Sequence, residues 1–355
     1  MHRLTRLLPI GALAAALAAG ACGDSTAPKP VDPSAMATTV GGINAAFSQN
    51  AVFQSLSALA ESFTLAAPTA RSSALQPVSG SGAAWATTSL GFMRDLGARA
   101  PAAVLTLFPA NVLGKTFVWD TASGGRYRIV DSSLAGASAN GVRFTLYQAD
   151  SVTHRPVLPL MTTGFVDLVD ASTPQANVLH QVLHVGTQTA ADYTTTGVKT
   201  TGSLTLTASG YVADVVSGGS PVNLQLSHAL TLADSSLATN YQVNGNGAAL
   251  AMHTTASGSA GNPTLGIDWS LAKGGASIGV IGSGTSNNAS LQFTFNGVTW
   301  ATVTGDLNGT PVIAGANGHV LTLADLYAMV QILQGFTDVG ASLDAVFGPA
   351  YLVFK

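Results

Sequence analysis

A few short motifs in the chain contain residue types that perform chemistry in other proteins. The segment "GASIG", Gly275 to Gly279, matches the G-x-S-x-G elbow that presents a serine nucleophile, which here would be Ser277. An elbow requires a strand, a sharp turn and a helix, whereas the surrounding "KGGASIGVIGSGTSNN" predicts strands with no helix after them. The overlapping "GVIGSG", Gly279 to Gly284, is a weaker match to a phosphate-binding loop, for the same reason. We interpret both motifs as chance products of a glycine-rich sequence.

Two histidines, His180 and His184, lie four residues apart in "LHQVLHVG". On a helix this spacing would place both rings on one face, where they could bind a metal ion. The alternating pattern and the β-branched residues predict a strand instead, on which the rings would lie roughly 13 Å apart along one face. We therefore interpret them as surface or half-buried histidines and predict no metal site.

Carboxylate pairs are a third candidate for chemistry, because two of them can hydrolyse a glycosidic bond. Asp167 and Asp170 lie in "GFVDLVD" and Asp268 lies in "IDWS". Three residues apart on a strand, the first two face opposite sides, and only long-range folding could pair either with Asp268. Turn formation and protection of sheet edges explain all three. The sequence therefore predicts no catalytic residue and no cofactor.

Aromatic residues could either line an apolar pocket or fill a core. A single curved sheet wrapped around a helix can leave a cavity between them, so both alternatives stay open at this stage. The residues concerned are Phe117, Trp119, Tyr127, Phe144, Tyr147, Phe293, Phe295 and Trp300.

The elements that must position these residues are mainly strands. From Lys115 the hydrophobic period becomes two, as in "NGVRFTLYQ" and "VNLQLSHALTL", and Asn-Gly pairs such as Asn296-Gly297 predict tight hairpins. We expect roughly ten to twelve strands between Lys115 and Ile313, with no βαβ alternation. The predicted fold is mainly antiparallel β, either a half-open barrel or a two-sheet sandwich, with an N-terminal and a C-terminal helix packed on the sheet.

Two further segments predict the helices. We expect residues 41–114 to form a helical and loop segment, in which Val52, Leu56, Leu59 and Phe63 would make one apolar stripe. Residues 314–355 contain "TLADLYAMVQILQGF", which opens with the capping-box spacing of Thr322 and Asp325. At about fourteen residues this second helix is too short to span a bilayer, so we expect it to be buried against the β domain, residues 115–313. A short helix and a terminal strand are expected after it.

Composition limits the partners. Charged residues make up 9% of the chain, against roughly 25% in a typical soluble domain, and the net charge is -3. Without a basic patch, neither nucleic acid nor anionic lipid headgroups are expected to bind. The surface must instead consist largely of hydroxyl and amide groups.

The N-terminus predicts export. Arg3 and Arg6 precede an uncharged apolar run, and small residues then lead to Cys22, which is the only cysteine. The motif "LAAGAC" resembles the lipobox of bacterial lipoproteins, although Ala19 stands where the family usually has leucine. The resemblance implies a signal peptide, residues 1–21, and lipidation of Cys22 with a diacylglycerol and further acyl chains such as palmitate. A conventional cleavage after "AGA" stays open as an alternative.

After Cys22, residues 22–40 are Pro-containing and polar, and predict a lipidated tether. In enterobacteria an Asp directly after the lipidated cysteine retains a lipoprotein in the inner membrane. Because Gly23 takes that place here, the resemblance favours the outer membrane.

Three functions remain open from the sequence. The first is a non-enzymatic lipoprotein that binds a lipid or another apolar ligand, since the order of tether, helix, meandering strands and buried helix is similar in outline to carriers of the LolA/LolB kind. The second is a structural or protein-interaction lipoprotein of the cell envelope. The third, a hydrolase, has the least support. In each, the membrane is a partner through the lipid anchor.

Overall fold

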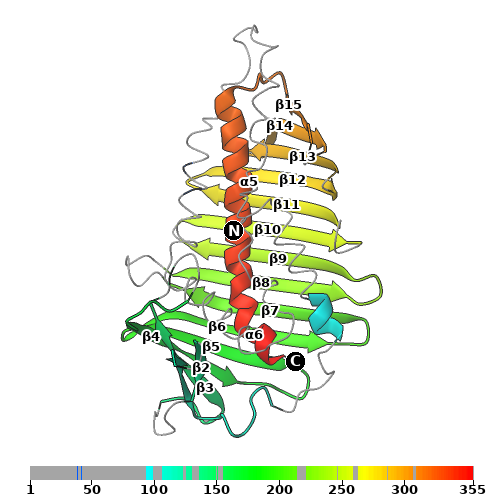
Figure 1. The fold of residues 1–355 in the computed structure, drawn as a ribbon. Helices are drawn as coiled ribbons and strands as arrows, with labels where there is room; N and C mark the ends of the chain where they lie inside the picture. Colours follow the sequence, from blue (N-terminus) through cyan, green and yellow to red (C-terminus); the bar gives the residue numbers. More distant parts are fainter. Residues whose placement is uncertain are drawn as a thin grey trace.

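The computed structural model describes residues 38, 41, 93–98 and 106–354, with gaps at 123–124, 130–135, 149, 151–154, 214–220, 246, 259–262, 286 and 307–308. These residues form mainly β structure in one open sheet of 15 strands, with a C-terminal helix lying across the strands (Figure 1). The strands are β1 (Thr116–Asp120), β2 (Arg126–Arg128), β3 (Gly141–Tyr147), β4 (Thr162–Asp170), β5 (Asn177–Val185), β6 (Gln188–Lys199), β7 (Ser203–Val212), β8 (Val222–Thr231), β9 (Ser236–Gly245), β10 (Ala248–Ser257), β11 (Thr264–Lys273), β12 (Ala276–Thr285), β13 (Asn288–Phe295), β14 (Val298–Gly305) and β15 (Val312–Gly315).

The sheet is an antiparallel meander over most of its width. From β3 to β15 each strand pairs with its neighbours in sequence, and the exception is β1, which pairs in parallel with β3 and antiparallel with β2. The mainly antiparallel β class predicted from the sequence is therefore confirmed. The two-sheet sandwich is not formed by the described residues, which make a single sheet with β2 and β15 at its edges.

The strand number exceeds the expected ten to twelve. Glycines interrupt the apolar alternation of β12, yet this segment pairs along its length with β11 and β13. The hairpin at Asn296-Gly297 has positive φ angles of 49° and 78°, as predicted for this dipeptide. Asn317-Gly318 also forms a turn, with positive φ angles of 52° and 77°. In Asn140-Gly141 and Asn244-Gly245 the glycine instead begins β3 and ends β9.

The C-terminal helix is longer than predicted. Helix α5 (Leu323–Asp344) continues eight residues past Phe336, and is followed by the 3-10 turn η1 (Ala345–Phe347) and helix α6 (Gly348–Val353). The predicted capping box is present: the Thr322 hydroxyl accepts a hydrogen bond from the Asp325 backbone N–H, and the Asp325 carboxylate accepts one from the Thr322 N–H. The expected terminal strand is absent from the described residues, because α6 runs to Val353.

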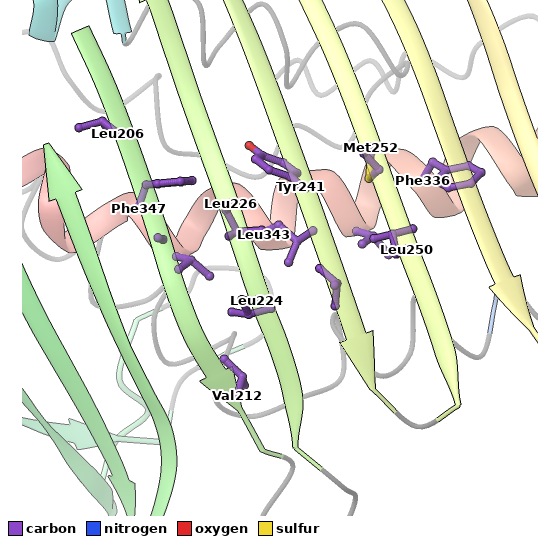
Figure 2. Close-up of a cluster of buried hydrophobic side chains, with 14 of the residues drawn as sticks. Leu206, Val212, Leu224, Leu226, Tyr241, Leu250, Met252, Phe336, Leu343 and Phe347 are labelled. Atoms are coloured by element: carbon purple, nitrogen blue, oxygen red, sulfur yellow. The ribbon is translucent and has the colours of Figure 1, made fainter. Parts of the chain in front are cut away.

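Alternation along the strands creates two faces with different chemistry. On the inner face, apolar side chains of β7 to β10 lie against α5 and η1 (Figure 2). Trp269 of β11 contacts Phe336 of α5 with ring centroids 5.6 Å apart, and each of these rings is almost completely buried. The prediction that the C-terminal helix packs on the sheet is thereby confirmed. The predicted N-terminal stripe, Val52 to Phe63, lies outside the described residues.

Candidate functional site

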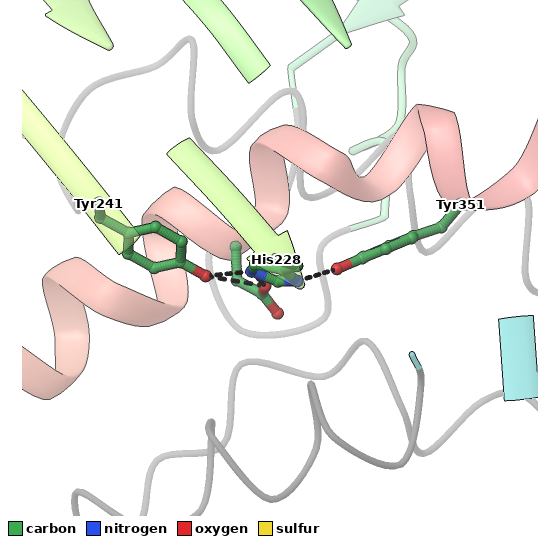
Figure 3. A network of polar contacts seen from close by, with 4 residues as sticks. His228, Tyr241 and Tyr351 are labelled. Atoms are coloured by element: carbon green, nitrogen blue, oxygen red, sulfur yellow. Dashed lines mark hydrogen bonds and ion pairs between the residues drawn. The ribbon is translucent and has the colours of Figure 1, made fainter. Parts of the chain in front are cut away.

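A buried polar cluster lies between the sheet and the C-terminal helices, and it contains four side chains from four elements (Figure 3). His228 of β8 is completely buried. Its Nε2 lies 2.5 Å from the Tyr241 hydroxyl of β9 and 3.2 Å from Asp344 Oδ1 of α5, and its Nδ1 lies 2.9 Å from the Tyr351 hydroxyl of α6. We call these four residues the His228 cluster.

A neutral imidazole with its proton on Nε2 is consistent with every one of these contacts. Nδ1 then accepts from the Tyr351 hydroxyl, and Nε2–H donates to the Tyr241 oxygen. The Tyr241 hydroxyl in turn donates to Asp344 Oδ1 over 3.2 Å. Burial, and secondarily the Asp344 carboxylate, raise the pKa of both tyrosines well above the ordinary value. Both hydroxyls therefore keep their protons in the folded protein.

The surroundings of the His228 cluster indicate a structural role. The imidazole lies between apolar groups, with the Phe347 ring centroid 4.5 Å from its own. None of the four residues is a serine or cysteine nucleophile, and three of them are almost completely buried. The cluster instead joins β8 and β9 to α5 and α6 through directional bonds. In a helix-to-sheet contact that is mainly apolar, such bonds hold the helices in one register.

A second polar group reinforces the same contact at η1. The Tyr193 hydroxyl of β6 donates to Gln181 Oε1 over 3.1 Å and lies 3.3 Å from the Val346 carbonyl oxygen. The Gln181 amide nitrogen donates to the Thr195 hydroxyl over 2.8 Å. Burial raises the pKa of Tyr193 well above the ordinary value. This group fastens η1 to β5 and β6.

The opposite face of the sheet has different chemistry. We define the outer face as the outward-pointing positions of β7 to β13, which alternate with the buried inner positions. Nearly all of them are Ser, Thr, Asn, Gln, Ala or Gly. The exceptions are Tyr211, His253, Asp268 and Ile281. Lysine, arginine and glutamate do not occur at these positions. Asp268 and His253 are therefore the only acidic or basic residues of the outer face.

Cross-strand pairing arranges the outer face in rows. The central row joins seven adjacent strands, and its members are paired one with the next. It consists of Thr207, Ser227, Asn240, His253, Asp268, Ile281 and Gln292. Within the row His253 Nδ1 lies 2.6 Å from Asn240 Oδ1. Adjacent strands are about 4.8 Å apart, so the row extends for about 30 Å.

Charged groups gather at one side of this face, on β3 to β6. Arg143 and Asp167 form a bidentate ion pair with N to O distances of 2.6 and 2.7 Å, and the guanidinium lies 3.9 Å from the centroid of the Phe165 ring. His180 Nε2 lies 2.8 Å from Asp192 Oδ1. These groups pair with each other on β3 to β6. The rows of β7 to β13 contain almost no charged side chains.

The structure separates the residues that the sequence singled out for chemistry. Ser277 lies in β12, a strand that leads directly into another strand, so the elbow geometry is absent, and its N–H donates to Asn296 Oδ1. His180 and His184 both lie on β5, as predicted. His184 stacks on Phe165 rather than meeting His180. Among the described residues, no group of three or more His, Cys, Asp or Glu side chains could bind a metal ion.

The three aspartates are also apart. Asp167 pairs with Arg143, whereas Asp170 accepts from the Leu107 and Ser172 N–H groups at the end of β4. Asp268 lies on β11 opposite His253, seven strands from β4. They do not form a carboxylate pair.

The aromatic residues pack in two separate groups of the core. Phe144 contacts both Phe117 and Tyr127 at the β1 to β3 end, and the Phe117 and Phe144 rings are stacked at 4.7 Å. Phe293 and Trp300 meet near the other edge, 6.1 Å apart.

Sequence reasoning missed the His228 cluster, although one signal was present. In "VNLQLSHALTL" His228 occupies a position of the apolar series Leu224, Leu226 and Leu230. A histidine at such a position is buried and must find partners. The partners came from β9, α5 and α6, which no local pattern connects to it.

Cys22 lies outside the described residues. In the part of the chain that is described, no helix has the length and apolar character needed to cross a membrane. Comparisons with protein-family models, with curated proteins and with solved structures find no match to this chain.

Proposed function

We propose that this protein is a non-enzymatic lipoprotein of the cell envelope, held at the outer membrane through lipidated Cys22, and that it contacts other envelope components through its outer face. The observation that carries the proposal is the difference between the two faces of the sheet. One face is covered by α5 and α6, and the other is exposed, polar and almost uncharged over seven strands.

The packing of the inner face favours this interaction function over the carriage of an apolar ligand. A carrier needs apolar side chains that are free to contact its ligand. Here Trp269 packs on Phe336, and His228 packs on Phe347. The polar bonds of Tyr241 and Tyr351 further fasten the helices to the sheet. A lipid that took the place of α5 would have to break these contacts, so the carrier remains the second hypothesis.

Lipidation is tested by expressing the full chain in a bacterial host supplied with an alkyne analogue of palmitate. We expect the wild-type protein to incorporate the label and to fractionate with membranes. Cys22→Ser should lose both properties, while Ser25→Ala, three residues further on, should keep them. Equal labelling of wild type and Cys22→Ser would refute the anchor.

Native mass spectrometry of the protein purified in mild detergent separates the two functions. An interaction lipoprotein should have the mass of the chain with its anchor only. A further stoichiometric lipid that persists in the spectrum would contradict the proposal and support the carrier.

A further inference from the structure

The outer face has a hydrogen-bonding chemistry that limits its partners. Each serine or threonine hydroxyl donates one hydrogen bond and accepts others, and each asparagine or glutamine carboxamide also does both. Gln225 of β8 lies opposite Gln242 of β9, and Ser209 of β7 lies opposite Gln225, so the same chemistry continues from strand to strand. A partner that matches this face must itself donate and accept at closely spaced positions.

Charged partners do not fit this surface. Nucleic acids and anionic lipid headgroups bind through lysine and arginine, which release counterions or pair with phosphate. The outer face has neither residue, and its one aspartate, Asp268, would repel an anion. A strongly cationic partner could pair with only one carboxylate of the outer face, that of Asp268, because the neighbouring residues are uncharged.

A protein partner, including a second copy of this chain, fits less well than an uncharged ligand. Binding energy at protein interfaces is concentrated in tryptophan, tyrosine and arginine, and homodimer interfaces have an apolar centre. Apart from polar side chains such as glutamine and histidine, the outer face has two large side chains, Tyr211 and Ile281. They lie on β7 and β12, with four strands between them, and cannot form one anchor.

The shape of the array favours a polymer over a small molecule. A neutral hydrogen bond contributes about 0.5 to 1.5 kcal/mol net, so a single sugar would bind weakly. A chain lying along the central row could contact several strands in succession over about 30 Å and gain from multivalency. Because sugar hydroxyls both donate and accept, we propose that the outer face binds an uncharged polysaccharide. This inference rests on the proposed function, in which the same face is the contact surface.

The test uses the full chain in mild detergent, mixed with insoluble cellulose, chitin or curdlan, which are uncharged, and with carboxymethylcellulose, which is the charged counterpart of cellulose. Gln242→Ala/Gln292→Ala removes two exposed amides from the outer face. Gln175→Ala/Gln331→Ala removes two exposed amides elsewhere, from a turn and from α5, and is the matched control. Circular dichroism establishes that both variants are folded.

We expect wild type and control to sediment with at least one uncharged polysaccharide, and the outer-face variant to bind about tenfold more weakly, since two hydrogen bonds are lost. Sedimentation with none of the three, or equal binding by the two variants, would overturn the inference. Binding to carboxymethylcellulose alone would also overturn it. The same holds if the wild-type protein is a dimer and the outer-face substitutions make it a monomer. If the palmitate label and the native mass behave as proposed but no polysaccharide binds, the lipoprotein function stands and only the identity of the partner fails.

Discussion

Raising the pH above 10 should unfold this protein through its buried tyrosines. The hydroxyls of Tyr193, Tyr241 and Tyr351 are buried in the contact between the sheet and the C-terminal helices, and burial raises the pKa of each well above the ordinary value. In the unfolded chain these groups ionise near pH 10. Between that pH and the folded pKa, the native state holds protons that the unfolded state has released.

The sign and size of the effect follow from this difference in bound protons. Because the unfolded state binds fewer protons, the free energy of unfolding falls as pH rises, and its full value is present only below about pH 10. Each tyrosine contributes a slope of about 1.4 kcal/mol per pH unit, so the three together give about 4 kcal/mol per pH unit. A domain of ordinary stability, about 5 to 15 kcal/mol, should therefore unfold within a few pH units above 10.

The assay is denaturant unfolding, followed by circular dichroism, at a series of pH values from 8 to 12. Tyr351→Phe should reduce the alkaline slope by about 1.4 kcal/mol per pH unit, because one buried ionisable group is gone. The control is Phe347→Leu, which weakens the same contact by about 1.5 kcal/mol but keeps every tyrosine, so its curve should lie parallel to that of the wild type. A wild-type free energy that stays constant from pH 9 to 11, or equal slopes for wild type and Tyr351→Phe, would refute the reasoning.

Further substitutions test the contact of α5 with the sheet and the cap at its first turn. Phe336→Ala removes the ring that contacts Trp269 and should cost about 3 to 5 kcal/mol, measured by urea unfolding with tryptophan fluorescence; a cost below 1 kcal/mol would show that the two rings do not share a core. His228→Leu should cost about 2 to 5 kcal/mol because it removes both hydrogen bonds of the imidazole from a buried contact. Combining it with Tyr351→Phe should cost less than the sum of the single changes; strict additivity would argue against a network. Thr322→Ala should cost about 1 kcal/mol, and Thr322→Ser, which keeps the capping hydroxyl, should restore most of it in the same melts.

Local patterns explain why much of the fold was predictable. Period-two alternation in "VNLQLSHALTL" predicted β8, and the Asn296-Gly297 turn has the positive φ angles that this dipeptide favours. The capping box of Thr322 and Asp325 marked the start of α5 at the correct residue. In each case the signal lies within a few neighbouring residues. The end of α5 was placed too early, at Phe336, whereas the helix continues through the buried residues Val339, Gly340 and Leu343 to Asp344.

The candidate sites depended on contacts far apart in sequence. His228 could be recognised as a histidine in an apolar series, but its partner Tyr351 is 123 residues away, and no local rule relates the two. The rows of the outer face have a similar origin. Each strand separately places Ser, Thr, Asn or Gln at alternate positions, yet only the register between strands aligns Asn240 with His253 and Asp268.

The amino-acid sequence by itself determined the local elements of this protein: where the long strands alternate, where the C-terminal helix begins, and that few of its surface groups are charged. The tertiary structure decided that fifteen strands form one sheet rather than two, that α5 covers one face of it, and that His228, Tyr241, Asp344 and Tyr351 meet. The physical reason is the range of the interactions. Periodicity, capping and turn geometry act between near neighbours, whereas strand register and helix packing are selected by the burial of apolar surface contributed from the whole chain.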